Sequence, residues 1–258
     1  MQAVSEWFNI NNLALNAKKT KCINFCPPNV KENNININLN NNVLDLVDNT
    51  IFLGLTLDKR LQWGPHIEVL SSRLSSAAYA VWKIRGVTDI DTARTVYFSY
   101  FHSLMTYGLL LWGHAADANS IFILQKRAIR AIYKLRRRDS LRELFKETNI
   151  LTFYSQYIYD NIMYTRKNIN NLPKNCDNHN INLRNKNKIE VPRFRLSRIK
   201  SSFMGNSIRF YNKLPENVLN LTNTKFKRLI KETLVKKAYY SIDDYMNDKD
   251  IWCASSST

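Results

Sequence analysis

The fold is decided by residues 51–67, which read Ile51-Phe-Leu-Gly-Leu-Thr-Leu-Asp58 and then Lys59-Arg-Leu-Gln-Trp-Gly-Pro-His-Ile67. The first part is a β-rich apolar run interrupted by Gly54, and a glycine inside a strand usually marks a bulge or the close approach of another backbone. Pro65 suits the first turn of a helix. Upstream the pattern is that of a short α/β fragment, and downstream it is almost wholly helical. We therefore predict a mainly α fold preceded by a small α+β part.

Periodicity outlines the expected elements on both sides of this junction. A helix is expected within 3–15, ended by Asn11-Asn12, and strands are expected at 22–25, 43–47 and 50–57, with a small hairpin in the asparagine-rich segment between them. After Pro65 the apolar residues recur every three or four positions, as on one face of a helix. Such patterns predict helices at 67–86, 91–104, 119–135, 140–147, 152–167, 203–214 and 225–240.

Composition points to a polyanionic partner. The chain of 258 residues carries a formal net charge of +17, and an excess of this size favours nucleic acid or an anionic membrane surface. No helix pairs a basic face with the exposed aromatic and apolar residues that an interfacial helix needs, which favours nucleic acid over a membrane. The four scattered cysteines do not suit a disulfide scaffold. We find no targeting or membrane-spanning pattern and expect an intracellular protein of the nucleus or cytoplasm.

The positive charge is concentrated in two windows. Residues 126–142 hold eight basic side chains against one acidic, and residues 184–213 hold nine against one. Within the first window Lys126, Arg127, Arg130 and Lys134 fall on one side of the expected helix, which then ends in Arg136-Arg-Arg138. A basic face of this kind suits a phosphate backbone, because each contact releases condensed counterions. A solvated face that binds nothing is the alternative for either window alone.

A catalytic or metal-binding constellation is not evident. The six glycines form no phosphate-binding loop, and Cys176 with His179 has zinc-like spacing without a second pair of ligands. The adjacent pair Asp243-Asp244 could in principle hold Mg²⁺, but it follows a lysine-rich helix, where helix capping or solvation is the favoured interpretation. We therefore predict no catalytic and no metal-binding residue.

Five motifs, in order, resemble reverse transcriptases of non-LTR retrotransposons, the jockey-like group especially. They are Asn16-x-x-Lys19-Thr20 with the strand that follows it, Phe52-Leu-Gly-Leu-Thr-Leu-Asp58 with Trp63-x-Pro-His-Ile67, Tyr107-Gly-x-x-x-Trp112-Gly, Leu124-Gln-Lys-Arg-Ala-Ile-Arg130, and Phe210-Tyr-Asn-Lys-Leu-Pro215. The resemblance implies the end of a polymerase palm with its primer-grip hairpin at 1–62, a helical thumb at 63–115, a basic helical post-thumb region at 116–168, an asparagine-rich linker at 169–190 and a helical region at 191–250.

The same resemblance implies roles for single residues. Lys19 would approach the incoming triphosphate, and Phe52, Leu53 and Gly54 would press on the primer backbone. As pure structure, Lys19 is a surface turn residue, and the other three form a buried strand with a bulge. The side chains expected to contact template or primer phosphates are Lys126, Arg127, Arg130, Lys134, Arg136, Arg137 and Arg138.

The departure from the family pattern concerns catalysis. Family members carry their Mg²⁺-binding aspartates ahead of the Asn-x-x-Lys-Thr motif, and this sequence has no such residues there. We expect a truncated reverse transcriptase that binds RNA or DNA, holds no cofactor of its own and polymerises nothing alone. The alternatives are a non-enzymatic helical module that binds DNA or RNA as an accessory protein and, less favoured, a helical adaptor for other proteins. The sequence leaves the oligomeric state open.

Overall fold

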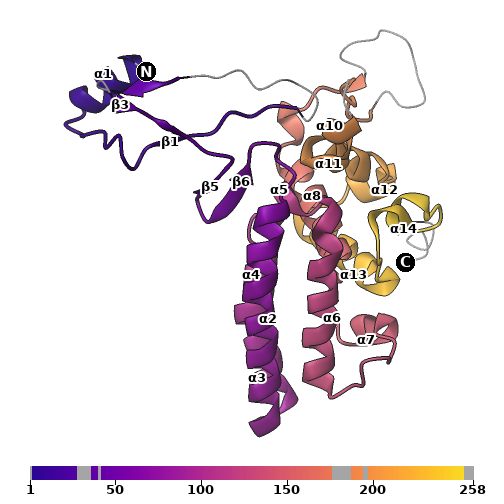
Figure 1. Ribbon diagram of the computed structural model, residues 1–258. Helices are drawn as coiled ribbons and strands as arrows, with labels where there is room; N and C mark the ends of the chain where they lie inside the picture. Colours follow the sequence, from indigo (N-terminus) through magenta and orange to yellow (C-terminus); the bar gives the residue numbers. More distant parts are fainter. Residues whose placement is uncertain (1, 28–35, 40–41, 176–186, 194–196, 253–258) are drawn as a thin grey trace. The chain divides into compact units, whose positions relative to one another are not determined.

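A computed structural model of the protein describes residues 2–27, 36–39, 42–175, 187–193 and 197–252. The chain forms two compact units, Met1–Val69 and Leu70–Thr258. In the described residues, the first unit holds short strands, an N-terminal helix and the start of a long helix, and the second unit is mainly helical (Figure 1). The prediction of a mainly α fold preceded by a small α+β part is confirmed.

The first unit is built from short strand pairs. Its elements are α1 (Gln2–Ile10), β1 (Lys21–Cys22), β2 (Asn38–Leu39), β3 (Asn42–Val43), β4 (Asp45–Leu46), β5 (Asn49–Phe52) and β6 (Leu55–Asp58). Within the described residues β1 pairs with β4 in parallel, whereas β2–β3 and β5–β6 are antiparallel pairs. The strand expected at 22–25 is shorter than predicted, because only Lys21 and Cys22 are paired.

The expected continuous strand through Gly54 is wrong, because the chain reverses there. Phe52 pairs with Leu55, so Leu53 and Gly54 form a two-residue hairpin turn. Both have positive φ, 47° and 77°, as in the type I′ turns whose twist suits antiparallel strands. Glycine adopts this conformation without steric cost, whereas leucine does so at a penalty. The apolar run is therefore the hairpin that the family resemblance implied, with Gly54 at its tip.

Asp58 organises the connection between the hairpin and the first long helix. Its carboxylate accepts hydrogen bonds from the backbone N–H groups of Trp63 (2.8 Å), Gln62 (3.0 Å) and Arg60 (3.2 Å). Trp63 is buried, and its carbonyl accepts from the Ile67 N–H. His66 Nδ1 accepts from the Thr56 N–H on β6 at 3.4 Å. The residues between β6 and α2 thus form one loop, in which the Asp58 carboxylate satisfies three backbone N–H donors.

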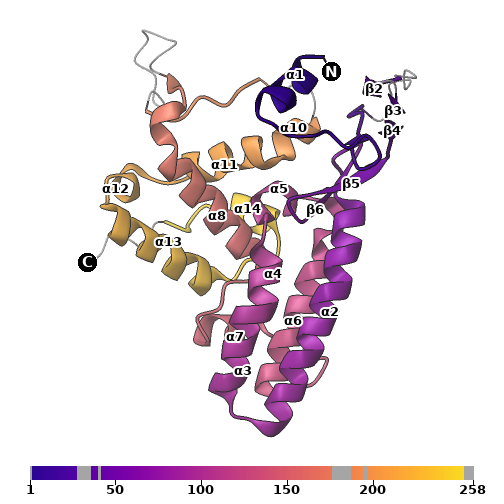
Figure 2. The same ribbon diagram turned by 90° about the vertical axis from the view of Figure 1, so that its left-hand side faces the viewer.

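Three helical segments of the second unit run up and down beside one another (Figures 1 and 2). The first is α2 (Gly64–Val87), which begins in the first unit. The second, the middle segment, consists of α3 (Ile90–Val96), the π-helical turn η1 (Tyr97–His102) and α4 (Ser103–Thr106). The third is α6 (Asn119–Tyr133). The hydroxyls of Ser71 and Ser120 lie 3.5 Å apart, and Arg85 Nε donates to the Ile132 carbonyl at 2.9 Å. Because these contacts join start to start and end to end, α2 and α6 run parallel.

The middle segment departs from regular helical spacing. Its fully buried side chains are Ala93, Tyr97, Phe101 and Met105, four residues apart. A π-helical turn contains more residues than an α-turn, so it keeps a four-residue repeat on one face and leaves Tyr100 exposed. The segment begins at the N-cap Asp89, whose carboxylate accepts from the Thr92 N–H at 2.9 Å.

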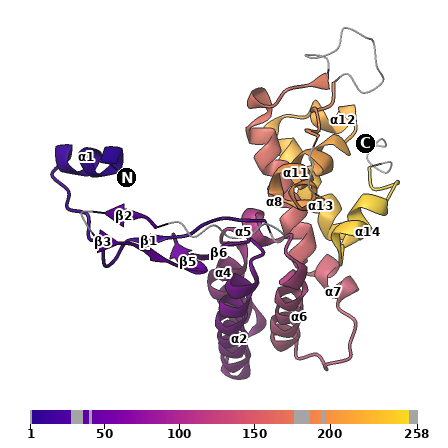
Figure 3. The same ribbon diagram turned by 45° about the horizontal axis from the view of Figure 1, so that its top comes forward.

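The remaining helices of the second unit are α5 (Leu109–Trp112), η2 (Ala116–Ala118), α7 (Arg142–Glu147), α8 (Phe153–Lys167), η3 (Ile169–Asn171), α10 (Ser197–Ser201), α11 (Phe203–Asn212), α12 (Glu216–Leu219), α13 (Asn223–Lys237) and α14 (Ile242–Asn247). Of these, α5, α11 and α13 pack on α8 (Figure 3). The predicted helices near 140–147, 152–167, 203–214 and 225–240 are confirmed, with ends shifted by up to three residues.

The motif around Trp112 is explained by packing of α5 on α8. The indole Nε1 of Trp112 donates to the Tyr107 carbonyl at 2.9 Å, and the ring stacks on Phe153 with centroids 5.7 Å apart. A Cβ on Gly113 would lie 2.5 Å from Cδ2 of Tyr157 and 2.7 Å from the Leu109 carbonyl oxygen. Only glycine fits this approach without displacing the Tyr157 ring.

Part of the predicted linker lies within the described residues. Lys174 and Ile189 form an isolated antiparallel bridge, and the Asn212 side chain accepts from the Ile189 N–H (3.0 Å) and donates to its carbonyl (2.8 Å). The pair Cys176 and His179 lies outside the described residues.

Candidate nucleic-acid interface

A groove of about 890 Å³ lies between α2 and α6 within the second unit. The last three turns of α2 form one wall of the groove, and the basic C-terminal end of α6 forms the other. The aromatic and basic residues that line it include Tyr79, Trp82, Lys83, Arg127, Arg130 and Lys134. The groove therefore joins an aromatic wall to a basic wall.

The aromatic wall consists of two exposed rings beside an ammonium group. Tyr79 and Trp82 are 52% and 55% exposed, and their ring centroids lie 5.6 Å apart. Lys83 Nζ lies 5.6 Å and 5.4 Å from the two centroids. Positions i, i+3 and i+4 share a helix face, and this face is not the buried stripe that runs through Leu74, Ala77 and Val81. Large exposed rings next to a cation suit stacked bases beside a phosphate.

The basic wall is set by the way in which α6 ends. Lys134 has left-handed dihedral angles and its N–H donates to the Arg130 carbonyl, which stops the helix. Arg130 Nη2 donates to the Asp139 carbonyl at 3.0 Å, so this guanidinium partly supports the next loop. Arg127 and Lys134 are exposed, and neither is in an ion pair with another described residue. Their charges face the groove.

The loop after α6 adds an exposed arginine triplet. Arg136, Arg137 and Arg138 all lie on the surface, in a turn closed by the Asp139 carboxylate, which accepts from the Arg136 N–H at 2.8 Å. In the part of the chain that the structure describes, none of the three forms a salt bridge. The predicted basic block therefore continues from the end of the groove into this loop.

Lys126 does not line the groove, unlike Arg127, Arg130 and Lys134. Its Nζ lies 4.4 Å from the Phe122 ring centroid and 5.6 Å from that of Tyr240. Burial of the ammonium group lowers the pKa of Lys126, and the nearby Arg130 charge acts in the same direction. Arg142 approaches the same Tyr240 ring, with Cζ 4.5 Å from its centroid. Lys126 thus makes cation–π contacts within the fold, and its predicted contact with phosphate stays a prediction.

In the first unit, Lys19 lies in an exposed turn. The Asn16 carbonyl accepts from the N–H groups of Lys19 (3.1 Å) and Thr20 (3.0 Å) and from the Thr20 hydroxyl (2.9 Å). The Asn16 side chain also accepts from the Lys19 N–H at 3.3 Å. The Asn-x-x-Lys-Thr motif is therefore a self-contained turn that presents Lys19 as an exposed cation.

The hairpin tip is exposed, which contradicts the expectation of a buried strand at Phe52, Leu53 and Gly54. Phe52 and Leu53 are 60% and 73% exposed. An apolar tip held in a tight turn is suited to contact with another molecule, and Leu53 occupies its left-handed position despite the steric penalty.

The second basic block, 184–213, lies only partly within the described residues. Arg184, Lys186 and Arg195 lie outside the described residues. Lys213 faces inward, where its ammonium group donates to the carbonyls of Tyr245 and Met246 (2.9 Å to Met246) and lies 4.8 Å from the Tyr245 ring centroid. The described part of this block therefore includes a cation that is used within the fold.

Of the aspartate pair Asp243-Asp244, Asp244 takes part in capping. The N-cap hydroxyl Ser241 Oγ accepts from the Asp244 N–H at 3.0 Å, and the Asp244 carboxylate accepts from the Tyr240 N–H at 3.1 Å. Asp244 also lies 3.9 Å from Arg142. Among the residues that the structure describes, no three His, Cys, Asp or Glu side chains gather as a metal site requires. The chain as described does not fit the two-metal site implied by the resemblance.

Sequence reasoning missed Tyr79, Trp82 and Lys83. The signal that could have found them is their helical spacing, because these aromatic and basic residues lie on a face of α2 that is separate from its buried apolar face. Only the parallel arrangement of α2 and α6 brings them opposite Arg127 and Lys134.

These features define a helical protein with a basic, aromatic-lined groove. In comparisons with known proteins, 101 residues, 37% of this chain, are 35% identical to the probable RNA-directed DNA polymerase from transposon BS of Drosophila melanogaster. The match spans 11% of that protein, so the chain corresponds to a small part of its length. This similarity supports a relationship to transposon reverse transcriptases. No family model and no solved structure matches the chain.

The helices within the described residues include none that is both long and apolar enough to cross a bilayer.

Proposed function

We propose that this chain is the primer- and template-binding part of a retrotransposon reverse transcriptase of the jockey-like group, comprising the end of the palm, the thumb and the region that follows. The groove between α2 and α6 is the proposed contact surface for nucleic acid. The observation that carries the proposal is the placement of the Tyr79–Trp82 ring pair and Lys83 opposite Arg127 and Lys134.

Physical chemistry favours a nucleic-acid strand over other polyanions in this groove. Lysine and arginine bind phosphates of a strand, while exposed tyrosine and tryptophan rings stack on bases and so add affinity that does not depend on salt. A solvated basic helix needs no exposed indole beside it. The similarity to a transposon polymerase supports the same partner.

The proposal assigns binding and not polymerisation to these 258 residues. Asp244 is committed to its helix cap and to Arg142, and phosphoryl transfer by two metal ions needs carboxylates that converge on the ions. Mg²⁺ would belong to the catalytic carboxylates of an intact family enzyme. A primer-extension assay with Mg²⁺ or Mn²⁺ that showed clear synthesis by this chain would overturn this part of the proposal.

Binding is tested by fluorescence anisotropy with a labelled RNA–DNA primer–template. With six or more phosphate contacts, affinity should fall on the order of a thousandfold between 50 and 200 mM salt. The double variant Arg127→Gln/Lys134→Gln should weaken binding and lower the salt slope by about 2.

The matched control carries the same charge change on another helix. Lys225 and Lys236 are exposed on α13, and Lys225→Gln/Lys236→Gln should leave the salt slope nearly unchanged. Equal losses in the two double variants would show attraction by net charge alone and would contradict a defined groove. Absence of binding at all salt concentrations would favour the protein-adaptor alternative.

A further inference from the structure

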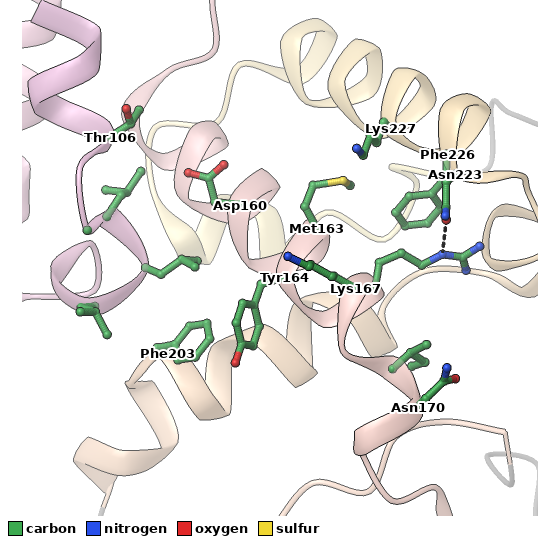
Figure 4. Close-up of a pocket in the computed structure, with 16 residues that line it drawn as sticks. Thr106, Asp160, Met163, Tyr164, Lys167, Asn170, Phe203, Asn223, Phe226 and Lys227 are labelled. Atoms are coloured by element: carbon green, nitrogen blue, oxygen red, sulfur yellow. Dashed lines mark hydrogen bonds between the residues drawn. The ribbon is translucent and has the colours of Figure 1, made fainter.

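A second cavity, separate from the groove between α2 and α6, lies in the C-terminal helical part of the second unit. Its volume is about 1210 Å³. Residues of α8, α11, α13 and the α4–α5 connection line it, and Figure 4 shows Asp160, Tyr164 and Lys167 of α8 beside it, with Phe203 of α11 and Lys227 of α13. Neither the sequence motifs nor the proposed function assigns a role to this cavity.

One face of α8 presents three kinds of chemistry to the cavity. Asp160, Tyr164 and Lys167 are spaced by four and three residues and so lie along one face, with about 10 Å along the helix axis between the backbone positions of Asp160 and Lys167. The Tyr164 ring, 41% exposed, is held by an edge-on contact with Phe203 at 4.6 Å between centroids. The sequence of α8 thus places a partly exposed ring at a position between an acceptor and a cation on this face.

Asp160 is a built part of the site and not a surface charge. Its Oδ1 accepts from Gln156 Nε2 at 2.9 Å. Burial raises the pKa of Asp160 to about 6, with the Gln156 hydrogen bond opposing that rise. The carboxylate has lone pairs left for further donors, since its two oxygens accept about four hydrogen bonds.

The cations of the cavity divide into one that supports the fold and two that are accessible. Arg166 donates to the carbonyls of Leu219 (2.6 Å) and Leu221 (2.9 Å) and stacks over Phe226, so it forms structure. Lys167 and Lys227 are exposed, and neither is in a salt bridge with a residue that the structure describes. They can serve an anionic group.

These groups together select a ligand class. A cation would suit Asp160 but not two lysines, and a simple anion would suit the lysines but not Asp160 or the ring. A nucleotide carries a flat base with a hydrogen-bonding edge at one end and a phosphate at the other. An ionised carboxylate can only accept hydrogen bonds. Guanine presents two adjacent donors, N1–H and N2–H, on its Watson–Crick edge and can therefore pair with both oxygens of a carboxylate. Adenine and cytosine place an acceptor beside their amino group, so they cannot.

We propose that this cavity binds an unpaired guanine nucleotide of a single strand, with the base on the Tyr164 ring, its N1–H and N2–H donated to Asp160, and its phosphates beside Lys167 and Lys227. The proposal rests on the proposed nucleic-acid binding function and adds a base-specific site to it. The base would be read in the way that proteins read splayed single-stranded bases, by stacking and by its Watson–Crick edge.

The test uses fluorescence anisotropy of the full chain with labelled twelve-nucleotide thymidine strands that carry one central guanine, hypoxanthine or adenine. Native protein should bind the guanine strand roughly tenfold more tightly than the hypoxanthine strand, which lacks N2–H and so cannot form one of the two charged hydrogen bonds. Asp160→Asn should abolish this preference, and Tyr164→Leu should weaken binding of all three strands. Asp117→Asn, an exposed carboxylate on η2 with the same charge change, should leave the preference intact.

The outcomes separate this proposal from the proposed function. If the primer–template binds and the three strands bind equally, the guanine site is wrong and the groove stands. An unchanged preference in a folded Asp160→Asn variant also overturns the guanine site. If a glutamate-rich peptide competes at the cavity and no strand does, the cavity belongs to a protein partner and the guanine site is wrong. Loss of all nucleic-acid binding overturns both proposals.

Discussion

The side-chain amide of Gln125 on α6 donates a hydrogen bond to the hydroxyl of Tyr97, 3.1 Å away on the π-helical turn. The same amide donates to the Leu151 carbonyl at 2.9 Å and accepts from the Phe153 N–H at 2.7 Å. Gln125 and Tyr97 are fully buried, and burial raises the pKa of the Tyr97 hydroxyl, which remains protonated as a result. Gln125 therefore links α6 to the π-helical turn and to the residues at the start of α8.

The variant Gln125→Leu should destabilise the second unit strongly. Leucine has a similar volume but would leave the Leu151 carbonyl and the Phe153 N–H buried without partners. Because each unsatisfied buried group costs about 1–3 kcal/mol, the expected loss is roughly 3 kcal/mol in the free energy of unfolding. Urea denaturation followed by circular dichroism measures it. Asn119→Leu, at an exposed position of the same helix, should change stability by less than about 0.5 kcal/mol, and equal effects in both would contradict the role of Gln125.

The helices could be predicted from sequence because their buried faces are long and regular. Ile67, Leu70, Leu74, Ala77 and Val81 form one buried face of α2, as their spacing predicts. The π-helical turn was not predictable in this way, since a wide turn follows from the packing of Tyr97 and Phe101 and changes the period by which inward residues are identified. Gln125 was missed for a related reason: a polar residue among apolar ones gives no sign of the three backbone and side-chain groups that it will satisfy.

The hairpin tip offers a prediction in the first unit. Leu53→Asn should stabilise the hairpin by about 1 kcal/mol, because leucine pays a steric penalty at positive φ that asparagine largely avoids. Slower amide hydrogen exchange at Thr50 and Leu57, which pair across the hairpin, would register the gain.

The control for the turn is Ile51→Asn, which makes a similar chemical change on the exposed strand β5. Asparagine is disfavoured in strands, so exchange at the same amides should become faster. If both variants shift exchange in the same direction, the turn conformation of Leu53 is not the cause. If Leu53→Asn also weakens primer–template binding, the apolar tip itself contacts nucleic acid, as the proposed primer grip requires.

The candidate site was only half visible in the sequence. Arg127, Arg130 and Lys134 could be assigned to a basic face because charge and helical spacing are both local properties. Their partners Tyr79, Trp82 and Lys83 lie more than forty residues earlier in the chain, and no local pattern reports which two helices run side by side. Lys126 illustrates the converse, since its position next to Phe122 and Tyr240 depends on α6 contacting the residues after α13.

Charge and stacking should separate cleanly in the salt dependence of binding. Replacing Arg136, Arg137 and Arg138 together by glutamine should lower the salt slope by up to about 2.7, or about 0.9 for each phosphate that is no longer neutralised. Trp82→Ala should instead reduce affinity by about 1–3 kcal/mol, the typical contribution of one stacked base, with the slope unchanged. Anisotropy titrations at four salt concentrations measure both quantities. A Trp82→Ala variant with native affinity would exclude stacking in the groove.

Asp160 provides a prediction about stability and pH. In the unfolded chain its carboxyl has an ordinary pKa of 3.8, and in the folded protein burial raises the pKa to about 6. The folded state therefore prefers the protonated form, so the native protein loses stability as pH rises from about 4 to above 6. Above pH 6 the penalty for holding the charge is roughly 3 kcal/mol, at about 1.36 kcal/mol for each pKa unit. Asp160→Asn removes the ionisation and keeps an acceptor for Gln156.

The variant should accordingly be more stable than the native protein at pH 7.5, with the difference shrinking towards zero at pH 4. Urea unfolding at both pH values measures it. His102, whose own pKa is lowered by burial and which is hydrogen-bonded to Gln156, titrates in both proteins, so comparing them removes most of its contribution. Asp117→Asn should show no such dependence on pH, since that carboxylate is exposed. A pH-independent difference for Asp160→Asn would mean that its carboxyl is not held in a buried, desolvated position. If instead the variant is more stable at pH 7.5 and also loses the preference for guanine, the buried carboxylate at this position lowers stability and supports recognition of the base.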